Sequence, residues 1–156
     1  MKYQMAILTK DMLSDLAKLE KMCFSVPWTE TMFLGELLNP AAVYRVILYE
    51  GKPVAYMGMW LVADEGQITN VAVHPDHRRQ GLAKELIHAF IDIAKHEELA
   101  LLTLEVRAGN QPAISLYESL GFYQVGLRRN YYEGKEDALL MNLAVNGEQE
   151  KGEKNS

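Results

Sequence analysis

The sequence predicts an α/β protein with a mixed central sheet of about seven strands and about four flanking helices. Segments in which apolar and polar residues alternate, as in half-buried strands, are interleaved with segments whose apolar residues recur every three or four positions. The resulting order is β-α-α-β-β-β-α-β-α-β-β, with no internal repeat and no second domain. A chain of 156 residues, 49% of them apolar, is long enough to bury one full core.

The first part of the chain predicts one strand and two helices. Residues 3–8 are expected to form a first strand, and residues 12–22 carry one apolar face of a helix that Thr9 or Asp11 can cap. Pro27 interrupts the chain. A second, shorter helix is expected over residues 29–38, because a proline follows at position 40 and disfavours further helix.

The middle of the chain changes to a period of two and then returns to a helix. Strands are expected at residues 44–49, 54–61 and 66–73, with a hairpin turn over Glu50–Pro53 between the first two. A polar loop follows. Gly81 then opens a long helix to about residue 96, and apolar residues cover most of its girth.

The last part of the chain predicts a strand, a helix and two more strands. The strand covers residues 101–106, and the helix runs from Gln111 to Leu120, where Gly121 suits a left-handed stop. Strands at residues 123–127 and 137–143 complete the sheet. We expect one domain over residues 1–145 and a polar, disordered tail over residues 146–156, which contain no apolar side chain.

Composition narrows the classes of function. The formal net charge of −5 argues against a surface that wraps nucleic acid. No apolar run is long enough to cross a bilayer, and the N-terminus does not resemble a signal peptide, so we expect no membrane association. Cys23 is the single cysteine, which favours a reducing, cytoplasmic location. His74 and His77 lack a matching pair of ligands, so no metal site is expected.

The loop between the third strand of this middle series and the long helix is the most informative segment. It contains Arg78 and Arg79, and Gly81 stands where the helix begins. A helix start presents unpaired N–H groups at the positive end of the helix dipole, which suits a phosphate group. Glycine lets the backbone approach a ligand closely, and the small Ala83 leaves room for one. Without further context, an ordinary strand-to-helix connection with a solvated basic turn explains the segment equally well.

The pattern Arg78-x-x-Gly81-x-Ala83, placed after the strand end Val71-Ala72-Val73, resembles the acetyl-CoA signature of the GNAT N-acetyltransferases. The order of elements is similar to that family's over nearly the whole chain. The resemblance implies acetyl-CoA as co-substrate. It also implies that the strand backbone holds the pantetheine arm and that the loop amides hold the pyrophosphate. The implied residues are Val71, Ala72 and Val73 for the arm and Arg79, Gln80, Gly81, Leu82, Ala83 and Lys84 for the pyrophosphate.

A narrower resemblance is to the bacterial ribosomal-protein alanine N-acetyltransferases, the RimI group. The matching segments are Pro27-Trp28-Thr29, Glu105-Val106-Arg107, Asn110, Leu116-Tyr117, Gly121-Phe122, Tyr131-Tyr132 and Glu136-Asp137-Ala138. This resemblance implies acetylation of a protein N-terminus, the alanine of small-subunit ribosomal protein eighteen. It implies that Glu105 accepts a proton from the incoming amine, directly or through water. Tyr117 would protonate the departing thiolate, and Asn110 would bind the cofactor.

Each of these residues also has a purely structural interpretation. Glu105 and Arg107 share one face of their strand and could form an ion pair. Tyr117 lies on the apolar stripe of its helix, and Asn110 stands where a helix N-cap belongs. The aromatic residues Trp28, Tyr131 and Tyr132 could shape an acceptor groove or only pack. Cys23 is most simply a buried apolar residue, so we expect direct attack within a ternary complex.

Acceptor chemistry leaves alternatives open. At pH 7 roughly one protein α-amine in seven is neutral, against roughly one lysine in 2,500, so an N-terminal amine demands less of a catalytic base. Acetylation of a small amine, such as a polyamine or an aminoglycoside, remains an alternative, because loops decide the choice of acceptor. A non-catalytic module that binds acetyl-CoA is a third possibility, against which Glu105 and Tyr117 argue. The oligomeric state is left open.

Overall fold

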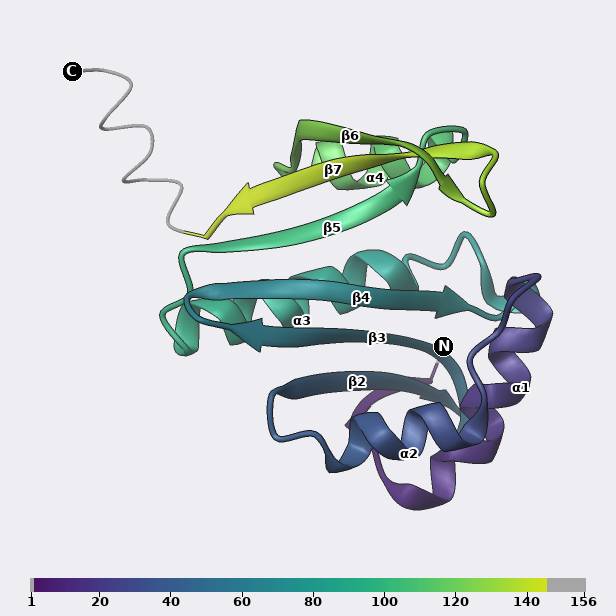
Figure 1. The fold of residues 1–156 in the computed structure, drawn as a ribbon. Helices are drawn as coiled ribbons and strands as arrows, with labels where there is room; N and C mark the ends of the chain where they lie inside the picture. Colours follow the sequence, from purple (N-terminus) through teal and green to yellow (C-terminus); the bar gives the residue numbers. More distant parts are fainter. Residues whose placement is uncertain (1, 146–156) are drawn as a thin grey trace. The chain divides into compact units, whose positions relative to one another are not determined.

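The computed structural model describes residues 2–145, and the expected tail at 146–156 lies outside them. The described residues form seven β-strands, four α-helices and two short 3₁₀ helices, which confirms the predicted fold class (Figure 1). The strands are β1 Tyr3–Ile7, β2 Ala42–Tyr49, β3 Lys52–Val62, β4 Glu65–Val73, β5 Leu101–Arg107, β6 Tyr123–Tyr132 and β7 Glu136–Ala144. The helices are η1 Lys10–Met12, α1 Leu13–Cys23, α2 Glu30–Leu38, η2 Pro75–His77, α3 Leu82–His96 and α4 Gln111–Ser119.

The strands form one mixed sheet in the order β1-β2-β3-β4-β5-β7-β6. The pairs β1–β2, β2–β3, β5–β7 and β6–β7 are antiparallel, whereas β4 and β5 are parallel. The parallel register runs from Glu65 opposite Leu101 to Gln67 opposite Thr103. The described chain divides into two compact units. The N-terminal unit comprises the residues up to Leu61 together with Thr69–Phe90, and the C-terminal unit comprises the rest.

In the N-terminal unit, helices cover both faces of the strands. Figure 1 shows α2 in front of β2, while α3 passes behind β3 and β4. Leu13, Leu16 and Leu19 of α1 are buried, which confirms the predicted apolar face. Helix α2 begins as expected, because the Thr29 hydroxyl oxygen accepts a hydrogen bond from the Met32 N–H at 3.2 Å.

The β2–β3 hairpin turn is shorter than predicted. Only Glu50 and Gly51 form it, with φ of 51° and 80°, the pair of positive values that a tight two-residue turn requires. Lys52 and Pro53 therefore belong to β3. Pro53 lies opposite Leu48 at a point where the register shifts, and such irregular positions tolerate a residue without an N–H.

In the C-terminal unit, β5 shows the alternation expected of a strand with one buried face. Leu102, Leu104 and Val106 are buried, and Glu105 and Arg107 lie on the other, half-exposed face. Strand β6 runs to Tyr132, five residues beyond the predicted end at 127. A break in the register after Arg128 hides this extension from a search for simple alternation.

A buried polar network ties α1, α2 and three strands together within the N-terminal unit. The Glu20 carboxylate, 2% exposed, accepts hydrogen bonds from the Trp28 N–H at 2.9 Å and from the Tyr56 hydroxyl. The Tyr56 oxygen in turn accepts from the Asn70 amide at 3.3 Å. Asn70 stands directly before Val71, so the network holds the strand segment that the resemblance assigns to the pantetheine arm.

The other end of the network is a second buried carboxylate. The Tyr44 hydroxyl lies 2.7 Å from Glu36 Oε1 and 3.2 Å from Asn70 Oδ1, and it donates its single proton to the closer carboxylate oxygen. The Trp60 ring N–H donates to the same carboxyl group at 2.9 Å from Oε1. Asn70 therefore lies between the carboxylates of α1 and α2.

Burial makes stability depend on pH through Glu20. Loss of hydration raises the pKa of Glu20 above its ordinary value, and the Trp28 N–H opposes this shift only in part. The folded protein therefore binds a proton that the unfolded chain releases above about pH 4.5, so Glu20 lowers the free energy of unfolding as pH rises through its folded pKa. We expect Glu20→Gln to remove this decline. Urea unfolding of both proteins between about pH 4.5 and 8 measures it, and parallel stability curves would contradict the expectation.

Candidate functional site

The loop between β4 and α3 is held at its start by aromatic contacts. The Tyr3 hydroxyl lies 2.9 Å from Nδ1 of His77, whose ring also packs on that of Tyr49 with centroids 4.9 Å apart. Two residues further along, Arg79 has a φ of 64°, a value that residues with a Cβ seldom adopt. Gly81 has a φ of 78°, which glycine adopts without strain. The chain thus enters α3 through two left-handed residues.

The two arginines of the loop have different surroundings. Arg78 Nε donates to the Val73 carbonyl at 3.2 Å, and its Nη2 lies 3.6 Å from the Cys23 sulfur. The guanidinium of Arg78 therefore joins the end of β4 to the end of α1. Arg79 is exposed and projects from the left-handed position. Of the two, Arg79 is better placed to add charge to an anion bound at the loop.

The start of α3 offers backbone donors. The Glu85 N–H donates to the Gly81 carbonyl at 3.0 Å, so the N–H groups of Leu82, Ala83 and Lys84 precede the first complete turn and lack an acceptor within the helix. A Cβ placed on Gly81 would have no heavy atom within 4 Å, so the space before these donors is open. Open space, first-turn amides and an exposed arginine fit a pyrophosphate group.

We expect Gly81→Val to abolish measurable acetyl-CoA binding. Valine at a positive φ is strained, and its branched side chain would fill the open space in which we expect a pyrophosphate to approach the backbone. Gly51→Val is the matched control, because Gly51 has a φ of 80° and equally open surroundings but lies in the β2–β3 turn. Calorimetry on both folded variants tests this, and unchanged affinity in Gly81→Val would refute the assignment of the loop.

Glu105 meets a different partner from the one its own strand suggests. Its Oε2 lies 3.0 Å from Nε of Arg128 on β6. The alternative prediction of a Glu105–Arg107 ion pair is therefore wrong. Arg107 binds the carboxylates of Glu136 at 3.1 Å and Glu133 at 3.3 Å instead.

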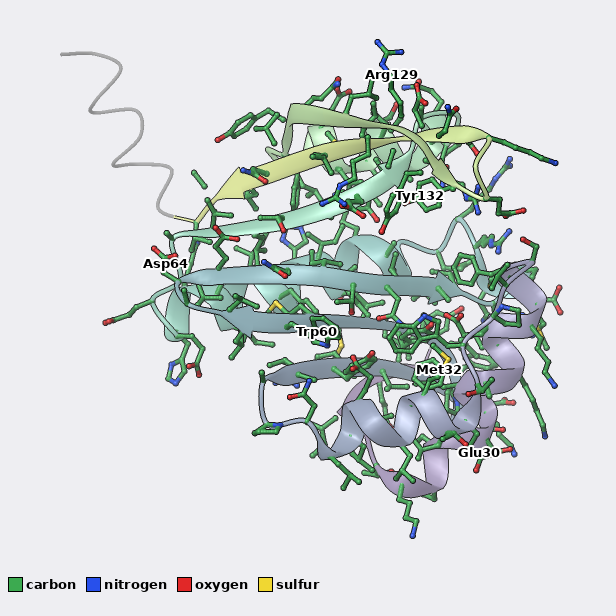
Figure 2. All side chains as sticks on the ribbon, in the orientation of Figure 1. Glu30, Met32, Trp60, Asp64, Arg129 and Tyr132 are labelled. Atoms are coloured by element: carbon green, nitrogen blue, oxygen red, sulfur yellow. The ribbon has the colours of Figure 1, made fainter. Side chains whose placement is uncertain are left out.

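Those contacts of Arg107 build a polar cluster at one end of β5. Its guanidinium lies over the ring of Tyr132, 4.3 Å from the centroid. The other oxygen of Glu136 accepts from the Gly109 N–H at 2.8 Å, directly before Asn110. Figure 2 shows the labelled Tyr132 beside the strands of this unit. The Glu136 carboxylate thus ties the loop before α4 to the start of β7.

Tyr117 is buried, 6% exposed, and packs on Phe122 with ring centroids 5.6 Å apart. Burial, and after it the neighbouring Tyr132, raise the pKa of Tyr117 to about 12. The phenol therefore stays protonated throughout the neutral range and remains a proton donor. Core packing and proton donation are compatible for this side chain.

Asn110 caps α4, as its structural interpretation predicts. Its side-chain oxygen accepts from the Ala113 N–H at 3.3 Å, which leaves the amide N–H₂ available for another acceptor. Trp28 packs on Phe33 with ring centroids 5.5 Å apart. Tyr131 is 47% exposed and is therefore better placed than Trp28 to meet an acceptor.

Sequence reasoning missed Arg128. Its signal was present in the two adjacent arginines before Tyr131, but nothing in the sequence tells which of them turns toward β5.

Among residues 2–145, no three His, Cys, Asp or Glu side chains lie close enough together to hold a metal ion. The described helices include none that is both long and apolar enough to span a membrane.

The family model and the most similar relatives indicate the same family for this chain. The model of the acetyltransferase (GNAT) family matches residues 13–122. The chain is 39% identical over 130 residues to the [ribosomal protein bS18]-alanine N-acetyltransferase of Escherichia coli (strain K12), covering 81% of this chain and 87% of the relative. It is 41% identical over 131 residues, 83% and 87% of the two chains, to a Bacillus subtilis (strain 168) protein that bears this name provisionally.

A solved structure agrees with these relatives. The crystal structure of the ribosomal-protein-S18-alanine N-acetyltransferase from Escherichia coli is similar with a TM-score of 0.86 and 36% sequence identity. The similarity covers 92% of this chain and 94% of that one. Fold and sequence therefore point to the same group of proteins.

Proposed function

Because the chain belongs to the acetyltransferase (GNAT) family, we propose that it transfers the acetyl group of acetyl-CoA to the N-terminal alanine of ribosomal protein bS18. The observation that carries the proposal is the 39–41% identity, across 81–83% of the chain, to relatives named for that reaction. Ribosomal proteins are cytoplasmic substrates, so the proposal places the enzyme in the cytoplasm.

The class of activity follows from the family itself. The chain is an acetyl-CoA-dependent N-acetyltransferase, and the resemblance stated from its motifs is confirmed. The alternative of a non-catalytic acetyl-CoA-binding module is therefore dropped. The residue roles given next are our proposal.

Acetyl-CoA binding is assigned to the end of β4 and the start of α3. The backbone of Val71, Ala72 and Val73 holds the pantetheine arm, and the segment from Arg79 to Lys84 holds the pyrophosphate. Support comes from the left-handed Arg79 and Gly81 and from the first-turn amides that follow them. The side-chain N–H₂ of Asn110 donates a hydrogen bond to the cofactor, while its side-chain oxygen caps α4.

The chemistry is assigned to Glu105 and Tyr117. The neutral acceptor nitrogen attacks the acetyl carbon, the bond from that carbon to sulfur breaks, and two proton transfers complete the reaction. Glu105 takes the proton that the nitrogen loses, directly or through water, and Tyr117 donates one to the departing sulfur. Its pKa of about 12 keeps the phenol protonated at neutral pH, so the proton to be donated is present when the thiolate leaves.

Direct attack is favoured over an acetyl-cysteine intermediate. Burial raises the pKa of Cys23, so its thiol is not activated as a nucleophile. Its sulfur is also engaged, since it lies 3.5 Å from the Val73 carbonyl oxygen and 3.6 Å from Arg78. Through these contacts Cys23 helps to hold the end of α1 against the end of β4.

A panel of acceptors tests the proposed substrate. Hexapeptides that differ only in their first residue, together with polyamines and an aminoglycoside, are incubated with acetyl-CoA while free thiol is followed. The bS18 sequence starting with alanine should give the highest kcat/KM. A higher kcat/KM for a polyamine or an aminoglycoside would contradict the proposal and favour acetylation of a small amine.

A further inference from the structure

Glu105 and Arg128 lie on one face of the sheet although they belong to strands that do not pair with each other. Strand β7 lies between β5 and β6, and its Ala138 is opposite Arg107 on one side and Arg128 on the other. Directly opposed residues share a face, and so do residues two apart along a strand, which places Glu105 on that face too. The small Ala138 leaves room for the Arg128 side chain to cross β7.

Tyr131 lies against the Arg128 guanidinium because β6 is irregular between these two residues. From Arg128 to Tyr132 the chain advances four residues while β7 advances two, from Ala138 to Glu136. Tyr131 is three residues from Arg128, so in a regular strand its side chain would point to the opposite face. Within the bulge Asn130 has a φ of 52°, and its N–H donates to the Asp137 carboxylate at 2.8 Å. Asp137 thereby stabilises the turn of chain that brings the Tyr131 ring to the Arg128 guanidinium.

The result is a row of contacts that leads from the Tyr131 ring through Arg128 to the Glu105 carboxylate. Arg128 Nε lies 3.0 Å from Glu105 Oε2, and the guanidinium lies over the Tyr131 ring, 5.4 Å from its centroid. Arg107, the nearest cation along β5, is already held by Glu133 and Glu136. Arg128 is therefore the cation that pairs with the Glu105 carboxylate.

We infer that Arg128 is the positioning residue of Glu105. A glutamate on a half-exposed face can sample several rotamers, and the ion pair with Arg128 selects one of them before the acceptor arrives. The Tyr131 ring packs against the Arg128 guanidinium and limits its movement. This inference rests on the proposed role of Glu105 as the catalytic base.

We expect Arg128→Gln to lower kcat for the acceptor peptide about tenfold. Without the ion pair the Glu105 side chain is free to adopt its other rotamers, and ordering one long side chain costs a free energy of about this size. The KM for acetyl-CoA and the thermal unfolding midpoint should stay close to those of the parent. Arg129→Gln is the matched control. It removes the same charge at the next position, and Figure 2 shows Arg129 projecting away from the strands. An equal loss in both variants would mean a general charge effect and would overturn the inference.

Two further measurements separate positioning from structure. Guanidinium ion at a non-denaturing concentration should restore part of the kcat of Arg128→Gln, whereas equal sodium chloride should not. In the Glu105→Gln background, Arg128→Gln should cause no further loss, because its effect passes through the carboxylate. Independent, multiplicative losses would contradict the inference.

The inference and the proposed base fail in different ways. Full activity of Glu105→Gln would remove Glu105 from the chemistry and with it the proposed base. A slow Glu105→Gln beside an Arg128→Gln that matches the parent would leave the base in place and refute only the positioning role.

Discussion

Replacing Tyr117 by phenylalanine is expected to lower kcat by about 10²–10⁴, the usual contribution of a positioned proton donor. The substitution removes one hydroxyl and keeps the ring that packs on Phe122, so the free energy of unfolding should hardly change. Single-turnover release of free thiol measures the effect on the leaving group. Because the pKa of Tyr117 is raised to about 12, the parent enzyme should show no loss of kcat from its ionisation below about pH 11.

Tyr44→Phe is the matched control for a buried tyrosine hydroxyl without a chemical role. Its oxygen lies 2.7 Å from Glu36 Oε1, so its loss leaves a buried carboxylate short of one donor. We expect it to lower the free energy of unfolding by about 1–3 kcal/mol. Tyr117→Phe should therefore lower kcat with little change in stability, whereas Tyr44→Phe should lower stability with little change in kcat. Full activity in Tyr117→Phe would return Tyr117 to a purely structural role.

Local sequence signals were sufficient for most of the fold. The apolar face of α1, the Thr29 cap of α2 and the left-handed Gly121, with a φ of 105°, all depend on residues within one or two turns. The loop before α3 could be predicted for the same reason, since a strand end, a glycine and a helix start are neighbours in the sequence. The positive φ of Arg79 could not, because no short-range preference requires it.

The partners of Glu105 depended on features that short sequence patterns do not carry. Arg128 reaches Glu105 across β7, from a strand that does not pair with β5. A bulge stabilised by Asp137 then brings Tyr131 to the Arg128 guanidinium. Alternation alone assigned Arg107 to Glu105, because it ignores the competing carboxylates of Glu133 and Glu136. The network around Asn70 is equally non-local, since its carboxylates come from α1 and α2. Long-range polar contacts were the part that sequence reasoning could not reach.

Glu105→Gln is expected to slow acetylation of an alanine-starting peptide most at low pH. An α-amine titrates near 7.8, so its neutral fraction rises steeply between about pH 6 and 8. At low pH few acceptor amines are neutral, and the carboxylate must collect the proton that the amine still carries. Glutamine keeps the shape of the side chain but cannot accept that proton. We expect kcat/KM to fall by about 10²–10⁴ at pH 6 and by less at pH 9.

The same variant and a blocked peptide decide the acceptor. Acetylating the α-amine chemically, while leaving a lysine inside the peptide, should abolish transfer, because only about one lysine in 2,500 is neutral at pH 7. Mass spectrometry of the product locates the acetyl group. If the blocked peptide is still modified at its lysine with comparable efficiency, the N-terminal specificity is wrong. If the defect of Glu105→Gln is the same at every pH, Glu105 takes only the proton that the neutral amine loses during attack and does not deprotonate the charged amine.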